Sequence, residues 1–119
     1  MDVEPSQAAS GLPGQTVTYT HIVTNTGNGL APEVFTISAV SGRWTPAWQP
    51  PTMSLAAGAA APLTVTLPIP AGVLSGTLDI LTVTVASQAS PAEVFDAVID
   101  TTTVGRLPPI YLPVILKDG

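Results

Sequence analysis

One stretch near the N-terminus, residues 17–29, constrains the fold more than any other part of this chain. It reads Val-Thr-Tyr-Thr-His-Ile-Val-Thr-Asn-Thr-Gly-Asn-Gly, so threonines alternate with larger side chains until a cluster of small polar residues. Alternation with period two and a high share of β-branched residues are typical of a strand with one buried face. The closing Asn and Gly residues indicate a tight turn. The stretch therefore predicts a half-buried β-strand that runs into a turn.

The remainder of the chain repeats this pattern in short runs separated by Gly, Pro and Asn, and no segment keeps a helical period. Pro5 marks the first run as an edge strand, and residues 41–51, rich in Pro and Trp, are expected to form a loop. We expect about seven strands, at residues 2–9, 15–25, 33–40, 52–55, 61–69, 77–87 and 92–104. Several short alternating strands between turns predict an all-β sandwich.

The alternation also predicts which side chains point toward the core. In four of the expected strands the apolar row is clear: Val17, Tyr19, His21 and Val23; Phe35, Ile37 and Ala39; Leu63, Val65, Leu67 and Ile69; Leu81, Val83 and Val85. In the last strand Phe95, Ala97 and Ile99 share one face, and Asp96 and Asp100 share the other. We expect those aspartates to form an outward acidic face that keeps the sheet soluble.

Composition excludes several classes of partner. The 119 residues suit one domain, with a net charge of −5 and only three basic residues, Arg43, Arg106 and Lys117. Three scattered cations cannot form a basic patch, so binding to nucleic acid or to an anionic lipid surface is disfavoured. There is no cysteine, which excludes disulfides and thiolate metal sites.

The two ends of the chain add further expectations. Met1 is followed by Asp2-Val3-Glu4-Pro5, which has neither the basic start nor the apolar run of a signal peptide. No apolar run reaches the roughly 20 residues that a membrane-spanning helix needs. We therefore expect no membrane span, and we expect a fragment of a longer protein in which Met1 is an added start.

Several motifs resemble one family in their order and spacing. They are Tyr19-Thr20 with Val23-Thr24-Asn25-Thr26-Gly27-Asn28, Ser41-Gly42-Arg43-Trp44, Leu55-Ala56-Ala57-Gly58-Ala59, Thr64-Val65-Thr66-Leu67-Pro68, Ile69-Pro70-Ala71-Gly72 and Ala86-Ser87-Gln88-Ala89-Ser90-Pro91. They are similar to segments of bacterial extracellular immunoglobulin-like repeat and accessory domains, including α-galactosidase-associated and cell-adhesion-related ones. Arg43 is an insertion relative to the family's Ser-Gly-Trp.

The resemblance implies an immunoglobulin-like Greek-key sandwich over residues 1–105, followed by a linker and apolar tail over residues 106–119. It implies a secreted or cell-surface bacterial protein in which this C-terminal module is a spacer, a stabiliser or an interaction surface beside neighbouring domains. It implies no enzyme activity, no catalytic residues and no cofactor. The alternative is a carbohydrate-binding accessory domain of a secreted glycosidase, with a polysaccharide as partner.

The residues that could carry chemistry are few. His21 could be a metal ligand or a general base, but we interpret it as a core histidine bonded to a backbone carbonyl or a threonine. No nucleophile motif accompanies it, and no loop carries the clustered oxygens of a calcium site. We therefore expect no metal site and no metal requirement for folding.

Two tryptophans and the tail are the remaining candidates. We interpret Trp44 as a core residue and Trp48 as an exposed ring on which a sugar could stack. In the tail, Ile110 to Leu116 is apolar on both faces of an extended segment, with Tyr111, Leu112, Val114 and Leu116 as candidate contacts. The tail is expected to be an added edge strand, in its own sandwich or in a second copy's, or else a sorting signal.

Overall fold

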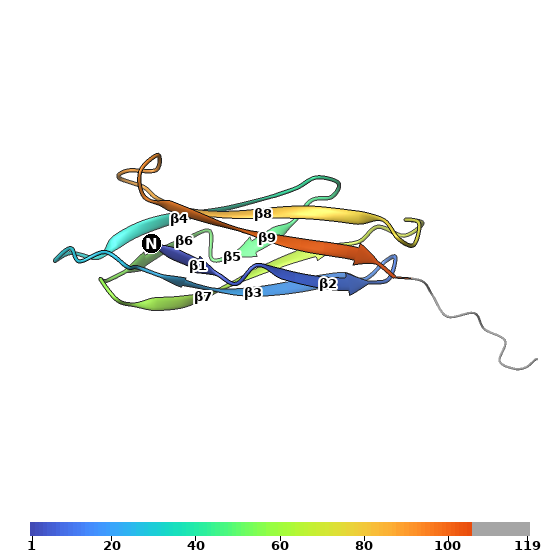
Figure 1. The fold of residues 1–119 in the computed structure, drawn as a ribbon, viewed down its shortest axis with the longest axis horizontal. Helices are drawn as coiled ribbons and strands as arrows, with labels where there is room; N and C mark the ends of the chain where they lie inside the picture. The colour runs from blue at the N-terminus through green and yellow to red at the C-terminus, as the bar shows by residue number, and fades with distance from the viewer. Residues whose placement is uncertain (106–119) are drawn as a thin grey trace, which may run out of the picture.

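The computed structural model describes residues 1–105 and contains nine β-strands in two stacked sheets (Figure 1). The first sheet has the order β1-β3-β7-β5, with bounds Asp2–Glu4, Thr16–Thr24, Ala60–Pro68 and Ala47–Gln49. The second has the order β2-β9-β8-β4-β6, with bounds Gln7–Gly11, Phe95–Val104, Leu78–Ser87, Glu33–Ser41 and Thr52–Leu55. The all-β sandwich expected from the sequence is confirmed.

Two departures raise the strand number above seven. Pro5 and Ser6 divide the expected first strand into β1, which pairs with β3, and β2, which pairs in parallel with β9. The expected edge position is confirmed, because β1 and β2 each end the order of their sheet. The expectation of an uninterrupted loop at residues 41–51 is wrong, because β5 lies within it and pairs with β7.

The core forms between the sheets from the alternate side chains of β3, β4, β7 and β8, as the sequence pattern predicts. Its largest fully buried residues include Tyr19, Phe35, Leu63, Leu67 and Leu81. Their neighbours in sequence point away from the core, so the burial pattern of β3 alternates along almost its whole length. Burying such side chains contributes roughly 1.5–3 kcal/mol each.

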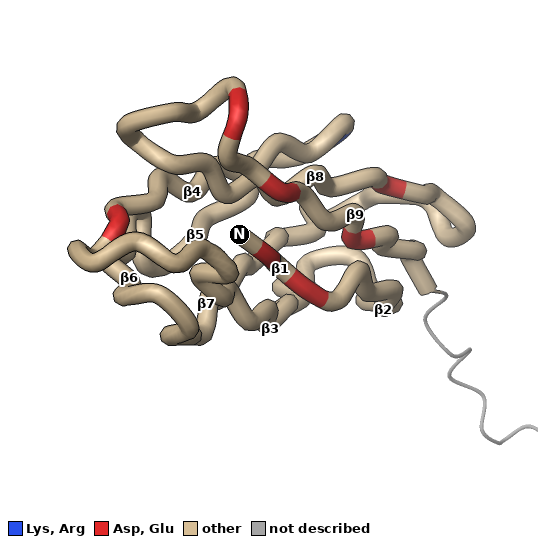
Figure 2. The backbone as a smooth tube through the Cα atoms, turned by 60° about the vertical axis from the view of Figure 1, so that its left-hand side comes forward, with Lys and Arg blue, Asp and Glu red and all other residues tan. Residues whose placement is uncertain are grey.

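Strand β9 has the opposite orientation to the one expected. Phe95 and Ile99 point outward and are 55% and 42% exposed, whereas Val98, Asp100 and Val104 point inward and are buried. Asp96 is half-buried and its Oδ2 accepts a hydrogen bond from the backbone N–H of Val3 at 2.9 Å. The expectation of an outward acidic face is therefore wrong, because Asp96 and Asp100 point inward and accept backbone hydrogen bonds there. Figure 2 shows the acidic residues spread over several strands and loops of the described chain.

Candidate functional site

A buried pair of hydrogen-bonded side chains joins the two sheets. His21 lies on β3 and Asp100 lies on β9, and His21 Nε2 is 2.6 Å from Asp100 Oδ2 with both side chains fully buried. The other carboxylate oxygen, Asp100 Oδ1, accepts a hydrogen bond from the backbone N–H of Gln7 at 3.2 Å. The expected burial of His21 is confirmed, but the expected partner is wrong: the partner is a carboxylate from the opposite sheet.

A second pair of polar side chains lies two residues along the same strands. Tyr19 Oη and Thr102 Oγ1 form a hydrogen bond of 2.6 Å, and Tyr19 Oη also donates to the backbone carbonyl of Thr101 at 3.1 Å. Together with His21 and Asp100 these residues form what we call the intersheet polar cluster, comprising Tyr19, His21, Asp100 and Thr102. Hydrogen bonds across the sandwich satisfy polar groups that burial would otherwise penalise.

The intersheet polar cluster holds a histidine beside a carboxylate, which is an arrangement that acid–base catalysis uses. A general base must however lie within hydrogen-bond reach of a substrate proton. All four side chains are at most 1% exposed, and His21 Nδ1 has no hydrogen-bond partner among the described residues. The geometry therefore gives the cluster a structural role, in which it fixes β3 against β9.

The protonation of Tyr19 provides a test of this packing. Burial raises the pKa of Tyr19 above its ordinary value of 10.0, and the charges of Asp100 and Asp79 add to the rise, whereas the hydrogen bond with Thr102 opposes it. A raised pKa in the folded state means that folding favours the neutral phenol. This contribution to stability is fully present below about pH 10 and is lost as the pH rises through the folded-state pKa.

We therefore expect the free energy of unfolding to fall above about pH 10, and to fall less steeply in Tyr19→Phe. Because the chain has only two tyrosines, Tyr111→Phe leaves Tyr19 as the single phenol whose ultraviolet absorbance reports ionisation. Ionisation of Tyr19 at its ordinary pKa in the folded protein would contradict the buried hydrogen-bonded position.

A second buried carboxylate organises the turn that follows β4. Asp79 Oδ1 accepts hydrogen bonds from Ser41 Oγ at 2.8 Å and from the backbone N–H of Arg43 at 3.0 Å. Ser41 Oγ in turn accepts from the backbone N–H of Trp44 at 2.9 Å, and Arg43 Nε donates to the carbonyl of Leu78 at 2.7 Å. Asp79 is 1% exposed and its Oδ2 is unpartnered among residues 1–105. Sequence reasoning missed this anchor, since Ser41 and Asp79 lie far apart in the chain.

The two tryptophans depart from expectation in opposite directions, Trp44 being less buried and Trp48 more buried than expected. Trp44 and Trp48 are both half-buried and both pack against the hydrophobic core. Trp48 belongs to β5, where it is paired with Val65 of β7. The contrast expected between a core Trp44 and an exposed Trp48 is wrong, because the short strand β5 brings Trp48 onto the sandwich.

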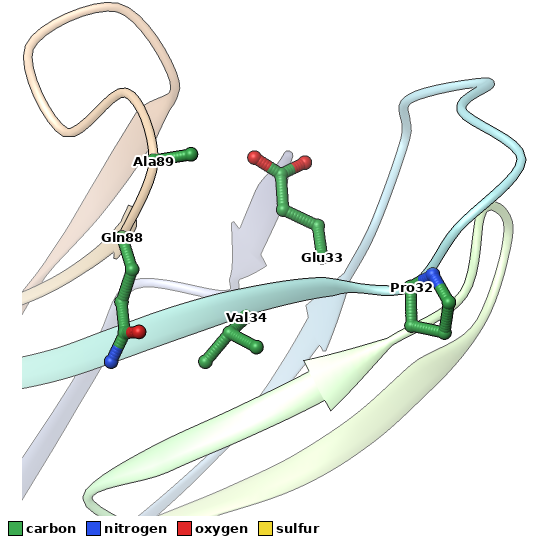
Figure 3. Close-up of a pocket in the computed structure, with 5 residues that line it drawn as sticks. All are labelled: Pro32, Glu33, Val34, Gln88 and Ala89. Carbon is green, nitrogen blue, oxygen red and sulfur yellow. The ribbon is translucent and has the colours of Figure 1, made fainter.

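A shallow pocket of about 390 Å³ lies where β4 begins and β8 has just ended, lined by Pro32, Glu33, Val34, Gln88 and Ala89. Figure 3 shows the Glu33 carboxylate pointing toward the loop that carries Ala89, with Val34 and Gln88 projecting away from it. Glu33 Oε2 accepts a hydrogen bond from Ser87 Oγ. Glu33 is the single ionisable group of the lining, so this pocket lacks the second acid, base or nucleophile that a hydrolytic site requires.

No three His, Asp or Glu side chains within residues 1–105 come together in a way that could hold a metal ion. The described part of the chain also has no helix long and apolar enough to span a membrane. The predicted contact residues Tyr111, Leu112, Val114 and Leu116 lie outside the described residues.

The outward side of the five-stranded sheet is the most unusual surface of the described chain. Six large apolar side chains on it are each at least 38% exposed, and we call them the apolar outer face: Val34, Val40, Leu78, Ile80, Phe95 and Ile99. The strands β4, β8 and β9 that carry them lie side by side (Figure 1).

The register brings several of these side chains together. Thr82 of β8 is opposite Val40 on one side and Ile99 on the other, and Ile80 is two residues before it. Directly opposed side chains lie about 4.5–5.5 Å apart and diagonal ones about 7–8 Å. Val40, Ile80 and Ile99 therefore form one apolar area around Thr82.

The strand positions of the apolar outer face carry no charge, and the nearest cationic side chain of the described residues is Arg43 at its edge, where Nε donates to the carbonyl of Leu78. The other outward positions of the five strands are Ala, Ser or Thr, because Asp79, Asp96 and Asp100 all occupy the inward rows. Exposed apolar patches of several large side chains are a feature of interaction surfaces. Sequence reasoning missed it, because Phe95 and Ile99 were assigned to the core.

Comparison with known proteins finds no matching family model and no matching curated protein. Among solved structures, the PapD-like domain 7 of human CEP192 superposes with a TM-score of 0.61 at 12% identity, covering 89% of this chain and 87% of that one. WR4, a member of the MSP family of C. elegans, gives 0.52 at 16% identity, covering 87% and 96%.

The CupB2 chaperone of Pseudomonas aeruginosa gives a TM-score of 0.57 at 12% identity, and the match covers 78% of this chain and 51% of the chaperone. Identities this low carry the fold alone. These structural similarities do not show membership of the bacterial repeat family whose motifs the sequence resembles. They show that this chain folds as an immunoglobulin-like β-sandwich.

Proposed function

We propose that this domain is a non-catalytic interaction module of a secreted or cell-surface bacterial protein, and that it binds protein through the apolar outer face. The observation that carries the proposal is the uncharged outward side of the five-stranded sheet, with six large apolar residues exposed. Protein interfaces place apolar side chains at the centre of the buried patch and deplete it of charge. Val40, Ile80 and Ile99, with Thr82 between them, form the apolar part of such a patch, and Thr and Ser occupy the outward strand positions beside them.

The remaining surfaces support a non-catalytic role. His21, the one histidine of the chain, is fully buried between the sheets, and the pocket at Glu33 has a single ionisable residue. The resemblance of the motifs to those of bacterial extracellular immunoglobulin-like domains supports the secreted or cell-surface location. Neighbouring domains of a longer parent protein are the partners that such a module meets first.

The proposal is tested by selecting peptides from a random display library against the full chain. Apolar peptides are expected to bind, and Ile80→Lys with Ile99→Lys is expected to weaken them at least about tenfold, since buried unpaired charge is costly. The matched control is Thr18→Lys with Thr64→Lys, which adds the same charge to exposed positions of the other sheet. Failure to select any peptide, or equal binding by the Ile80 and Ile99 variant, would overturn the proposal.

A parallel arm measures retention of the same chain on a panel of insoluble polysaccharides. The carbohydrate-binding alternative requires retention that Trp48→Ala abolishes, because sugar rings stack on aromatic faces. Such a result, together with no peptide binding, would replace the protein-binding role by a sugar-binding one. No retention, together with peptide binding at the apolar outer face, supports the proposal.

A further inference from the structure

Asparagine occurs only twice in the chain, and both asparagines lie in the connection between β3 and β4. The first, Asn25, is 4% exposed. Its Nδ2 donates to the backbone carbonyl of Leu55 at 2.8 Å, and its Oδ1 accepts from the backbone N–H of Gly27 at 2.9 Å. Its backbone N–H and carbonyl are bonded to Ala59 and Gly58. Every polar group of Asn25 therefore has a partner.

The second asparagine, Asn28, has the opposite surroundings. Asn28 and the following Gly29 are both exposed. Neither residue takes part in a hydrogen bond among residues 1–105. A segment without buried contacts or backbone hydrogen bonds opens at almost no cost in free energy. The Asn28 side chain can therefore turn toward the backbone nitrogen of Gly29.

We propose that Asn28 is a site of spontaneous deamidation. The backbone nitrogen of Gly29 attacks Cγ of Asn28, the carbon of the side-chain amide. The N–Cγ bond forms, the Cγ–Nδ2 bond breaks, and the amide group leaves as ammonia with the hydrogen that the Gly29 nitrogen gives up. Water then opens the resulting succinimide ring at either of its carbonyls, which leaves aspartate or isoaspartate at position 28. The modified chain carries one negative charge more than the net −5 of the sequence.

Gly29 is the residue that permits ring closure. It has no Cβ to shield its nitrogen, and it reaches unusual backbone angles at little cost. Asn25 is instead followed by Thr26, whose branched Cβ crowds the nitrogen. A Cβ added at Gly29 would lie 3.9 Å from the carbonyl oxygen of Ala31, with no closer contact outside its chain neighbours. Gly29→Ala therefore fits the fold and hinders only the ring closure.

The reaction changes the connection that leads into β4. In isoaspartate the main chain runs through Cβ, so the connection gains one backbone atom as well as a free carboxylate. Strand β4 begins with Glu33 and Val34, and Val34 belongs to the apolar outer face. The new charge therefore arises on the loop that precedes this face. Deamidation proceeds whether or not the face binds protein, so the inference is independent of the proposed function.

The experiment follows the full chain during incubation in mildly alkaline buffer, in which the attacking nitrogen loses its proton more readily. Ion-exchange chromatography separates the more acidic form, and tandem mass spectrometry locates the modified residue. We expect the acidic form to accumulate with the modification at Asn28, while Asn25 keeps its amide. Gly29→Ala is expected to lose this conversion over the same interval and to keep the circular dichroism spectrum of the wild type.

A parallel incubation in guanidinium chloride separates the contribution of the fold from that of the Asn-Gly dipeptide. Asn28 is expected to convert in the folded and unfolded chains at rates within about a factor of three, because its loop is already open. Much faster conversion in the unfolded chain would show that the fold protects Asn28 and would overturn the inference. So would the absence of conversion in the folded chain, equal conversion in Gly29→Ala, or conversion of Asn25 as fast as that of Asn28.

Discussion

His21→Leu is expected to lower the free energy of unfolding by about 3–5 kcal/mol, because it leaves the Asp100 carboxylate buried without its side-chain hydrogen-bond partner. Asp100 is fully buried and would keep one hydrogen bond, from the backbone N–H of Gln7 at 3.2 Å. A single backbone donor does not replace the hydrogen bond that Asp100 loses. The loss is measured by denaturant unfolding at neutral pH and is large against a typical total stability of about 5–15 kcal/mol.

Two further variants keep this prediction testable if His21→Leu does not fold. Asp100→Asn preserves the shape of the side chain and removes its charge, so it should cost less than His21→Leu. The double variant His21→Leu with Asp100→Leu should recover much of the loss, because an apolar pair of similar volume often replaces a buried ion pair at little cost. A loss below about 1 kcal/mol for His21→Leu would mean that the pair is solvated.

Phe35→Ala is expected to lower the free energy of unfolding by several kcal/mol more than Phe95→Ala does, although the chemical change is the same. Phe35 is fully buried between the sheets, so its loss should cost about 3–5 kcal/mol. Phe95 is 55% exposed on the apolar outer face, and its replacement should change stability by no more than about 0.5–1 kcal/mol. Denaturant unfolding of both variants, with the wild type as reference, measures the difference.

This pair of variants is also a direct test of the orientation of β9. If Phe95→Ala cost as much as Phe35→Ala, then Phe95 would belong to the core and β9 would have the orientation that its sequence pattern favours. Asp100 would in that case point to solvent, and His21→Leu would have little effect. Both predictions therefore depend on the orientation of β9.

The sequence alone determined the class of fold and most of the core. In β3, and in the middle of β4, β7 and β8, apolar side chains alternate with Thr or Ser, so only one orientation hides the apolar row from water there. The role of Pro5 at an edge was also predictable, since proline cannot donate to a sheet ladder. These are local properties, and the described structure confirms them.

The candidate sites depended instead on residues from distant parts of the chain. Both rows of β9 contain apolar residues, so alternation could not decide whether Phe95 and Ile99 or Val98 and Asp100 face inward. The tertiary structure decided the orientation of β9. His21 and the backbone N–H of Gln7 both form hydrogen bonds with Asp100, and a buried carboxylate is tolerated only where such partners exist. That orientation turns Ile99 outward beside Ile80, and it creates the uncharged surface on which the proposed function rests.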